Sequence, residues 1–446
     1  MSKHFRPWNI DQTLLLPPSV QDFVSKDHVS RFIVGLARES LDLRAITGSY
    51  VSGLGQPPFD PRMMVALLLH GYASGLYSSR RIARACCERN DFVMIVALDP
   101  PDFRTISDFR KRHLKALGEL FLQVLKLCET AGLVKLGHVA LDGTKIKANA
   151  SKHKAMSYER MKKREAELKA EVACMLAAAE AADAQEDETF GKDKRGDEMP
   201  DWASDKKKRL AKIQEAMAAL EAEAKLAAEE ERRIEAEKEQ QRNAEGRKKP
   251  GKPAAPPSDQ PDPKAQRNFT DPESRIMKSK EGFVQAYNAQ AAVDADAQII
   301  VAHELTQCGS DHGQLVPLVE AIENNLGRKP QQASADSGYC SEPNLEALVA
   351  RGIDGYVAPG RAKHPAAVNG KAGPLTQLMR KKIDDGGFET PYRLRKQVVE
   401  PVLEQIKEAR GFRQFLLRGV EKVRAEWAMI CTTHNLLKLF VLAKAA

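Results

Sequence analysis

The chain has 446 residues, of which 42% are hydrophobic and 29% are charged, and its formal net charge is +8. This length allows two or three domains with a substantial core, and the basic balance suits a polyanionic partner such as nucleic acid. The sequence excludes a membrane span, because it has no run of about 18 apolar residues, and a zinc cluster, because its seven cysteines are scattered. The N-terminus lacks the apolar run of a signal peptide, so we expect a cytoplasmic protein with free thiols.

Residues 1–135 are predicted to form a helical domain. The segment PRMMVALLLHGYASGLYSSRRIARACCERNDFVMIVAL has apolar residues at helical spacing, interrupted by a stretch typical of a turn between helices. The second of these helices begins at a Ser-Ser pair and places Arg80, Arg81 and Arg84 on one side, and the next helix carries Arg110. Such short helices with clustered arginines fit a helix-turn-helix-like DNA reader, and equally a helical bundle with an ordinary basic surface. The first interpretation makes these four arginines DNA contacts.

Residues 154–245 are predicted to be an inserted helical hairpin. Their composition, dominated by Ala, Glu, Lys and Arg, is typical of long exposed helices or coiled coils. Apolar residues recur at steps of three and four in two arms, as in a coiled-coil seam: Tyr158, Met161, Leu168, Val172, Met175, Ala179 and Ala182, and then Leu210, Ile213, Met217, Leu220, Ala224 and Ala227. Residues 246–270 are rich in proline and lysine without a period, which predicts a flexible linker.

Strand and helix patterns alternate over residues 271–446. Two strands over 283–292 and 298–306 are predicted to form a hairpin, followed by a helix closed by Gly327. A short strand ending in Asp336, a helix, another short strand and two further helices complete the chain. Together with a first strand within residues 136–153, this order predicts an α/β fold, interrupted by the large insertion after its first strand.

Two predicted strands, in VALDGT and ASADSGY, end in the aspartates Asp142 and Asp336. An Asp-Gly pair after an apolar run most simply indicates a strand that meets a turn. Strand ends on neighbouring strands lie close in space, and two buried carboxylates repel each other unless a divalent cation neutralises them. Glu400, in QVVEPVLEQIK, offers a third acid on a helix face that it shares with Lys396 and Lys407. Pro401 predicts either a kink in that helix or a helix that starts there.

Other polar residues have structural interpretations. Asp311, in TQCGSDHGQ, competes for a place among the acids, but capping of the following helix is the preferred interpretation. Thr144 and Lys145 either contact a DNA backbone or stabilise the turn after Asp142. The remaining assignments are Asp294 and Asp296 as turn formers, His434 and Asn435 as the cap of the last helix, and Thr105 or Ser107 as the cap of the helix that carries Arg110.

The motifs LDGTKIKANAS, ADSGY and YRLRKQVVEPVLEQIK, with PPFDPRMMVALLLHGYASGLYSSRRIARAC and PDFRTISDFR before them, are specific in combination. With them the chain resembles the DDE transposases of bacterial insertion sequences, over nearly all of its length outside the hairpin and linker. The resemblance implies a ribonuclease H-like mixed sheet flanked by helices, with an N-terminal all-helical DNA-binding domain. The domains then comprise residues 1–135, 136–153 (the first strand of the catalytic core), 154–245, 246–270, and 271–446 (the remainder of the core and the C-terminal helix).

The resemblance also implies roles for individual residues. Asp142, Asp336 and Glu400 become the catalytic residues and the ligands of two Mg²⁺ ions, for which Mn²⁺ can substitute. The family's tyrosine-arginine-glutamate-lysine signature maps onto Tyr392, then Arg395 or Lys396, then Glu400 and Lys407. Apart from Glu400, these are the implied DNA-binding residues. The step of seven from glutamate to lysine is kept, whereas the position of the arginine stays open. Leu403 and Glu404 stand where relatives often have Phe-Gly.

The implied activity is metal-dependent DNA strand cleavage followed by strand transfer, which moves an insertion sequence. Its partners are the terminal inverted repeats of the element and the target DNA, and joining two ends requires at least a homodimer in the DNA complex. The alternatives are a domesticated, inactive DNA-binding protein, a ribonuclease H-like nuclease without strand transfer, and a coiled-coil interaction protein. The presence of all three acids argues against the first alternative, and only the hairpin supports the last.

Overall fold

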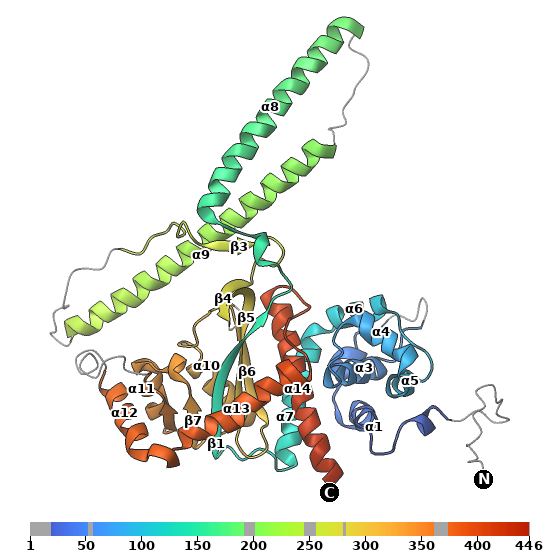
Figure 1. Ribbon diagram of the computed structural model, residues 1–446, viewed down its shortest axis with the longest axis vertical. Helices are drawn as coiled ribbons and strands as arrows, with labels where there is room; N and C mark the ends of the chain where they lie inside the picture. The colour runs from blue at the N-terminus through green and yellow to red at the C-terminus, as the bar shows by residue number, and fades with distance from the viewer. Residues whose placement is uncertain are drawn as a thin grey trace, which may run out of the picture.

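The computed structural model describes residues 19–51, 57–190, 201–244, 256–279, 282–360 and 373–445. Figure 1 shows three parts: a group of N-terminal helices, a mixed sheet flanked by helices, and two long helices that project away from the sheet. The mixed α/β architecture with a helical N-terminal region was predicted from the sequence. No helix within the described ranges is long and apolar enough to cross a membrane.

The N-terminal helices pack around one central helix. Within α3 (Pro61–Ala73), the ten residues from 64 to 73 are all buried, as expected for a helix surrounded by others. Its first turn is capped by Asp60, and the helix after the predicted turn starts at the Ser-Ser pair, as expected. The surrounding helices are α1 (Val29–Gly35), α2 (Arg44–Thr47), α4 (Ser79–Glu88), α5 (Asn90–Val96), α6 (Phe103–Arg112) and α7 (Leu114–Thr130).

The cap predicted for α6 was wrong. Neither Thr105 nor Ser107 caps this helix, because it begins earlier, at Phe103. Asp102 is the N-cap, and its Oδ1 accepts a hydrogen bond of 2.7 Å from the backbone N–H of Thr105.

The sheet is built around β1 (His138–Lys147), which lies between an antiparallel and a parallel neighbour. On one side β1 pairs antiparallel with β5 (Gly282–Asp294), whose other edge pairs with both β4 (Arg275–Ser279) and β6 (Ile300–Thr306). On the other side β1 pairs in parallel with β7 (Gln332–Ala335), and β7 with β8 (Asp354–Val357). The predicted hairpin is confirmed as β5 and β6. The first four residues of β1 are buried, which places the sheet at the centre of the core.

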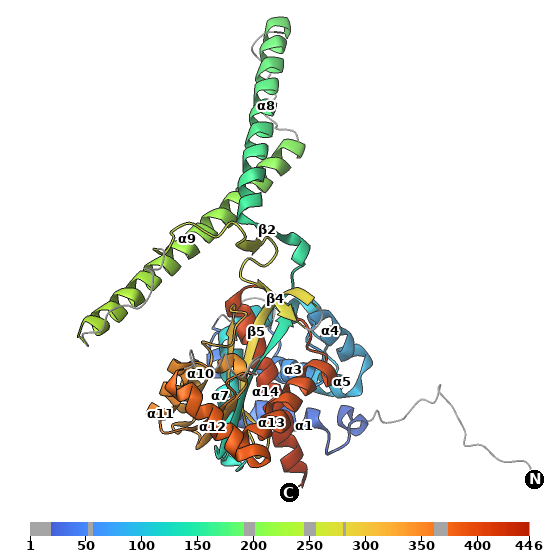
Figure 2. The ribbon, with the colours of Figure 1, turned by 60° about the vertical axis from the view of Figure 1, so that its left-hand side comes forward.

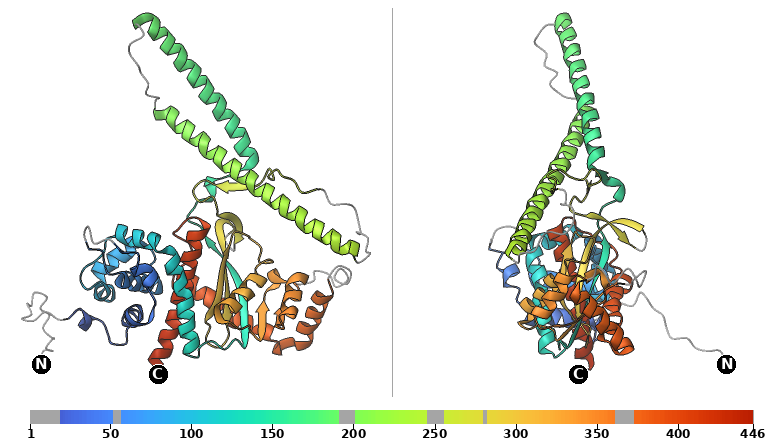
Figure 3. Two further views of the ribbon diagram at one scale, coloured as in Figure 1. Left: turned by 180° about the vertical axis from the view of Figure 1, so that it is seen from behind. Right: turned by 90° about the vertical axis from the view of Figure 1, so that its left-hand side faces the viewer.

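Helices that follow the strands complete the core. They are α10 (Leu315–Leu326), α11 (Glu342–Ala350), α12 (Pro374–Gly386), α13 (Leu394–Glu404) and α14 (Val420–Ala445). The end of α10 was predicted correctly, because Gly327 adopts a left-handed conformation with φ of 67°. Figure 3 shows α14 and α7 side by side between the N-terminal helices and the sheet, where α14 contacts α7, α3 and β6. One hydrophobic core therefore joins the N-terminal helices to the sheet.

His434 and Asn435 do not cap the last helix, as the sequence had suggested. Both lie inside α14 and are buried. The Asn435 side chain accepts a hydrogen bond from the backbone N–H of Ile300 (2.9 Å) and donates one to the Ile300 carbonyl (2.8 Å). These polar residues tolerate burial because they satisfy backbone groups at the start of β6.

The insertion consists of two helices on a short ribbon. The ribbon is formed by β2 (Ala155–Ser157) and β3 (Gln266–Asn268), and the helices are α8 (Tyr158–Phe190) and α9 (Asp201–Ala244). Near the ribbon the two helices share a cluster separate from the main core, which buries the predicted seam residues Tyr158, Met161, Leu168, Ile213, Met217 and Leu220. Figure 2 shows α9 continuing past this crossing without α8 beside it.

The predicted seam fails farther along α9. Ala227 is exposed, and Ala228 is buried in its place. The seam positions Met175, Ala179 and Ala182 lie outside the described side chains. The end of the predicted flexible linker is structured, since it contains β3, and Asp259 forms an ion pair with Arg232 of α9.

Excision of the insertion is expected to leave the rest of the protein folded. Ser157 and Gln266 face each other at the end of the ribbon, so an Asn-Gly turn replacing residues 158–265 closes it as a two-residue hairpin. The separate hydrophobic cluster is lost, together with the ion pairs of Glu223 with Arg267 and Arg275, and such partly exposed pairs contribute about 0–1 kcal/mol each. Thermal unfolding followed by circular dichroism should remain a single cooperative transition. Insoluble protein or a broad transition would show that the core depends on the insertion.

Candidate active site

The Asp142-Gly143 pair lies inside a strand, so the predicted turn at this position was wrong. β1 continues to Lys147, with Asp142 opposite Ala291 and Gly143 opposite Gln290 on β5. A Cβ atom at position 143 would lie 2.2 Å from Nε2 of Gln290, so any other residue there would force the buried Gln290 side chain to move. The glycine therefore permits a close approach of side chains rather than a turn.

Asp336 follows the last residue of β7, as predicted. Because Leu141 and Ala335 are paired on parallel neighbouring strands, Asp142 and Asp336 come next to each other at the same edge of the sheet. Asp336 Oδ1 accepts a hydrogen bond of 2.8 Å from the backbone N–H of Gly338 and so caps the short 3₁₀ turn η4 (Ser337–Tyr339). Pairing of the two strands thus brings together two acids that are far apart in the sequence.

Glu400 lies on α13, which packs across β1, β5 and β7. Pro401 lies inside this helix. Of the two predicted possibilities, a helix that starts at Pro401 is therefore excluded. Proline removes the hydrogen bond to the carbonyl four residues earlier, that of Gln397, and this carbonyl instead accepts a hydrogen bond of 3.0 Å from Gln298 Nε2. After α13 the chain forms one π-helical turn, η8 (Gln405–Ala409), which carries Lys407.

Arg395 links two of the three acids. Its Nη1 lies 3.0 Å from Asp142 Oδ2, and its Nη2 lies 3.2 Å from Glu400 Oε1. Arg395 is buried and its guanidinium carbon is 6.0 Å from the ring centroid of Tyr392, whereas Lys396 is exposed. Of the two basic residues that the sequence left open, Arg395 is the one beside the carboxylates.

The pKa of Asp142 is strongly perturbed. This pKa is raised to about 6, chiefly by burial; Arg395 and the backbone N–H of Gly143 lower it, and the negative charges of Asp336 and Glu400 add to the increase. Among the described residues, no three His, Cys, Asp or Glu side chains are gathered closely enough to hold a metal ion. The donors nevertheless suit a hard divalent cation, because carboxylate oxygens are its preferred ligands and a cation would neutralise these clustered charges, as Arg395 does here.

A groove of about 1080 Å³ lies beside the acids, between β1, the β4–β5 hairpin and the helix that carries Glu400. Asp142 and Glu400 line it, as do Thr144 and Lys407. The sequence reasoning missed three further cations that line it with Lys145: Lys147, Lys278 and Arg413. The alternation of Lys145 and Lys147 in one strand was a signal for Lys147. Arg413 could not be found this way, since its segment lies far from β1 in sequence and reaches it through tertiary contacts, such as the backbone hydrogen bond of 3.2 Å from the Lys147 N–H to the Arg413 carbonyl.

The predicted DNA-binding arginines of the N-terminal helices differ in exposure. Arg80, Arg81 and Arg84 are exposed on α4, where Arg84 pairs with Glu88 at 2.7 Å. Arg110 is buried, which corrects its assignment as a DNA contact. Its guanidinium donates hydrogen bonds to the Tyr77 carbonyl (2.8 Å), to Ser79 Oγ (3.1 Å) and to the Tyr72 hydroxyl (3.3 Å), so it joins α6 to the turn before α4.

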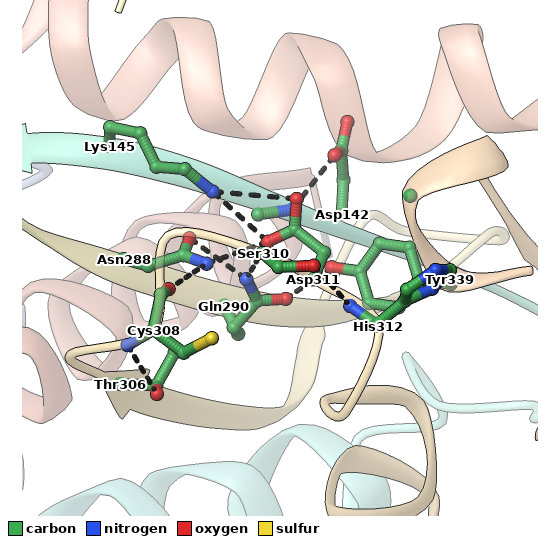
Figure 4. A network of polar contacts seen from close by, with 12 residues as sticks. Asp142, Lys145, Asn288, Gln290, Thr306, Cys308, Ser310, Asp311, His312 and Tyr339 are labelled. Atoms are coloured by element: carbon green, nitrogen blue, oxygen red, sulfur yellow. Dashed lines mark hydrogen bonds and ion pairs between the residues drawn. The ribbon is translucent and has the colours of Figure 1, made fainter. Parts of the chain in front are cut away.

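Asp311 does not cap a helix, contrary to the preferred interpretation of its sequence. α10 begins at Leu315 and has no side-chain cap. The Asp311 carboxylate points instead toward β1, where Lys145 Nζ lies 3.1 Å from its Oδ1 (Figure 4). Asp294, interpreted as a turn former, is buried and accepts hydrogen bonds from three backbone N–H groups, including that of Asp296 in the turn (3.0 Å).

Two family models match the chain, one toward each end. The model described as "Transposase domain (DUF772)" matches residues 18–112, and the model described as "Transposase DDE domain" matches residues 361–440. The first range covers the N-terminal helices up to α6, and the second includes Arg395, Glu400 and Lys407. No curated protein and no solved structure gives a match. The two matches support a DDE-type transposase of an insertion sequence, which acts in DNA transposition.

Proposed function

We propose that Asp142, Asp336 and Glu400 are the catalytic carboxylates and that they hold two Mg²⁺ ions, for which Mn²⁺ can substitute. The observation that carries the proposal is their convergence: adjacent strand positions for the two aspartates, and one guanidinium that contacts both Asp142 and Glu400. When bound, the two ions would activate the attacking oxygen and stabilise the leaving oxygen in cleavage and in strand transfer.

The protein's own residues position the carboxylates and the DNA strand. The backbone N–H of Gly143 donates a hydrogen bond of 2.8 Å to Asp142 Oδ1, and that of Gly338 donates one of 2.8 Å to Asp336 Oδ1. In each aspartate this leaves the second carboxylate oxygen directed away from the backbone. Once a cation neutralises Asp142 and Glu400, Arg395 no longer has to, and its guanidinium can bind a phosphate. Lys407, seven residues after Glu400 and on the groove wall, adds a second phosphate contact, and Tyr392 beside Arg395 is a third DNA-binding residue.

We further infer that the sheet is a ribonuclease H-like core. Support comes from its layout, in which β1 has an antiparallel hairpin on one side and parallel strands on the other, with an acid from β1, from the end of β7 and from a helix packed on them. The exposed Arg80, Arg81 and Arg84 suit recognition of the element's ends, and joining two ends requires at least a homodimer on the DNA. The insertion is proposed to be a coiled-coil hairpin, and the protein to act in the bacterial cytoplasm at the nucleoid.

A structure of the protein with Mn²⁺ tests the proposed metal site. We expect anomalous scattering from Mn²⁺ bound by Asp142 and Asp336, with Glu400 turned toward the metal and Arg395 displaced from both of its carboxylates. Mn²⁺ bound elsewhere, or an Arg395 clamp that persists at saturating Mn²⁺, would contradict the assignment. If only the two aspartates bind the metal, a structure of the protein with both Mn²⁺ and DNA decides whether DNA binding moves Glu400 to the metal.

A further inference from the structure

The loop between β6 and α10 brings a fourth carboxylate, that of Asp311, to the edge of the active site. A Cβ atom on Gly143 would lie 2.8 Å from Asp311 Oδ1, and one on Gly338 would lie 3.4 Å from Asp311 Oδ2. Asp311 thus sits between the residue that follows Asp142 and the turn that follows Asp336. The groove-lining residues include Gly143 but not Asp311, whose side chain is 20% exposed.

Three donors from two strands hold the Asp311 carboxylate (Figure 4). Its Oδ1 accepts hydrogen bonds from Asn288 Nδ2 (2.6 Å), from Gln290 Nε2 (2.7 Å) and from Lys145 Nζ (3.1 Å). Asn288 and Gln290 are fully buried on β5, the neighbour of β1. Buried amides cannot exchange partners with water, so they fix the position of this oxygen.

The same network reaches the turn after Asp336. The Tyr339 hydroxyl donates a hydrogen bond to Gln290 Oε1, and Gln290 Nε2 also donates one of 2.9 Å to Asn288 Oδ1. The pKa of the Tyr339 hydroxyl is raised well above its usual value by burial and by the charges of Asp311, Asp142 and Asp336. The network therefore connects β1, β5 and the segment that carries Asp336, next to the two proposed catalytic aspartates.

Lys145 is the member of this network that faces the groove. It lines the groove together with Asp142, its side chain is mostly buried, and its Nζ lies 3.1 Å from Asp311 Oδ1. An ammonium group has three N–H donors, so the contact with one carboxylate leaves donors for a phosphate oxygen. A lysine on a flexible stem gains precision from such an anchor, because fewer side-chain conformations compete with the productive one.

We propose that Asp311 is a positioning residue for strand cleavage, which anchors Lys145 so that its ammonium meets a phosphate of the bound strand beside Asp142. This inference rests on the proposed function of Asp142, Asp336 and Glu400. The proposal predicts that DNA affinity and cleavage rate, which usually change together, respond differently to the loss of Asp311. Loss of the Asp311 charge removes a negative group from the DNA face and so does not weaken phosphate binding, but it releases Lys145 from its fixed position.

Asp311→Asn is the variant that tests the anchor. The asparagine Oδ1 can still accept from Asn288 and Gln290, so the buried amides stay satisfied while the attraction for Lys145 is lost. The probe is a supercoiled plasmid that carries the DNA flanking this coding sequence, cleaved with Mn²⁺, and a duplex of the same DNA is bound in EDTA. We expect cleavage to slow by about 10- to 100-fold, as small misplacements of a reacting group do, with duplex affinity unchanged or tighter.

A double-mutant cycle with Lys145→Gln identifies the partner through which Asp311 acts. We expect Lys145→Gln to slow cleavage by a similar factor and the double variant to be no slower than either single variant. Asp27→Asn is the matched control, because Asp27 also pairs with a lysine (Lys444, 2.6 Å) but at the exposed end of α14, and it should cleave like the unmodified protein.

Several outcomes would overturn the anchor. The first is a normal cleavage rate for Asp311→Asn. The second is a double variant whose cleavage is slower by the product of the two single-variant reductions. The third is a loss of duplex affinity that parallels the loss of cleavage. If Asp311→Asn does not fold, Lys145→Gln alone decides, since normal cleavage by that variant refutes the role of Lys145. Asp142→Asn measured in the same assay keeps the two hypotheses apart, because normal cleavage by that variant rejects the proposed catalytic site itself.

Discussion

Asp142→Asn, Asp336→Asn and Glu400→Gln are each expected to reduce plasmid cleavage at least about a thousandfold while DNA binding is retained. Each amide has the size of the acid that it replaces, and an amide oxygen can still accept the hydrogen bonds from Gly143 and Gly338. What is lost is the negative charge that holds the cation. Metal ions contribute several kcal/mol to such displacements, and about 4 kcal/mol corresponds to a thousandfold in rate.

Matched controls exist for these three substitutions. Asp296 is an exposed aspartate in the turn between β5 and β6, and Glu304 pairs with Arg424 at 3.2 Å on β6. Asp296→Asn and Glu304→Gln should therefore cleave at the rate of the unmodified protein. Duplex binding measured in EDTA should be similar for all five variants. If any one of the three acids can be replaced with less than a tenfold loss of cleavage, that residue is not a metal ligand.

The affinity for Mn²⁺ is expected to fall about tenfold for each pH unit below 6. The pKa of Asp142 is about 6, so its carboxyl group is mostly protonated below that pH and ionised above it. A carboxylate must be ionised to bind a metal, so below this pKa each bound ion has to displace a proton. Above pH 6 the affinity should level off. Mn²⁺ titrations followed by electron paramagnetic resonance between pH 5 and 8 measure this dependence.

Asp142→Asn separates this titration from general effects of acid. The variant should bind Mn²⁺ weakly and lose the component of the pH dependence that is centred near 6, whereas Asp296→Asn should keep it. Arg395 lowers the pKa of Asp142, so Arg395→Gln should move the midpoint to higher pH. An Mn²⁺ affinity that is equal at pH 5 and pH 7 would mean that Asp142 does not take part in binding.

The three acids illustrate how far local patterns reach. Asp142 and Asp336 could be singled out because each follows a short run of buried residues, which is visible in four or five consecutive positions. Glu400 could be placed on a helix from the spacing of its neighbours. Which of the two possibilities at Pro401 holds could not be decided from the sequence, because the carbonyl of Gln397, which the proline leaves without its helical partner, is satisfied by Gln298, about a hundred residues away.

Asp311, Arg110 and the Asp142-Gly143 pair show where local reasoning fails. A helix-capping aspartate, a surface arginine and a turn are the commonest interpretations of such residues in isolation. Each was overruled by groups distant in sequence: Asn288, Gln290 and Lys145 for Asp311, the turn before α4 for Arg110, and pairing with β5 for Asp142-Gly143. In each case the partner is a group that the neighbouring residues do not reveal.

The sequence by itself determined the elements of this transposase, namely the N-terminal helices, the strand order along the chain, the inserted pair of helices, and the two aspartates that follow short apolar runs. These features follow from hydrophobic periodicity, which depends only on neighbouring residues. Only the tertiary structure decided that Arg395 rather than Lys396 contacts the acids, that Arg110 is internal, and that Asp311 holds Lys145. The physical reason is that the partner of a buried polar group is set by how distant segments pack, and a charge is tolerated in the interior only where that packing supplies a partner.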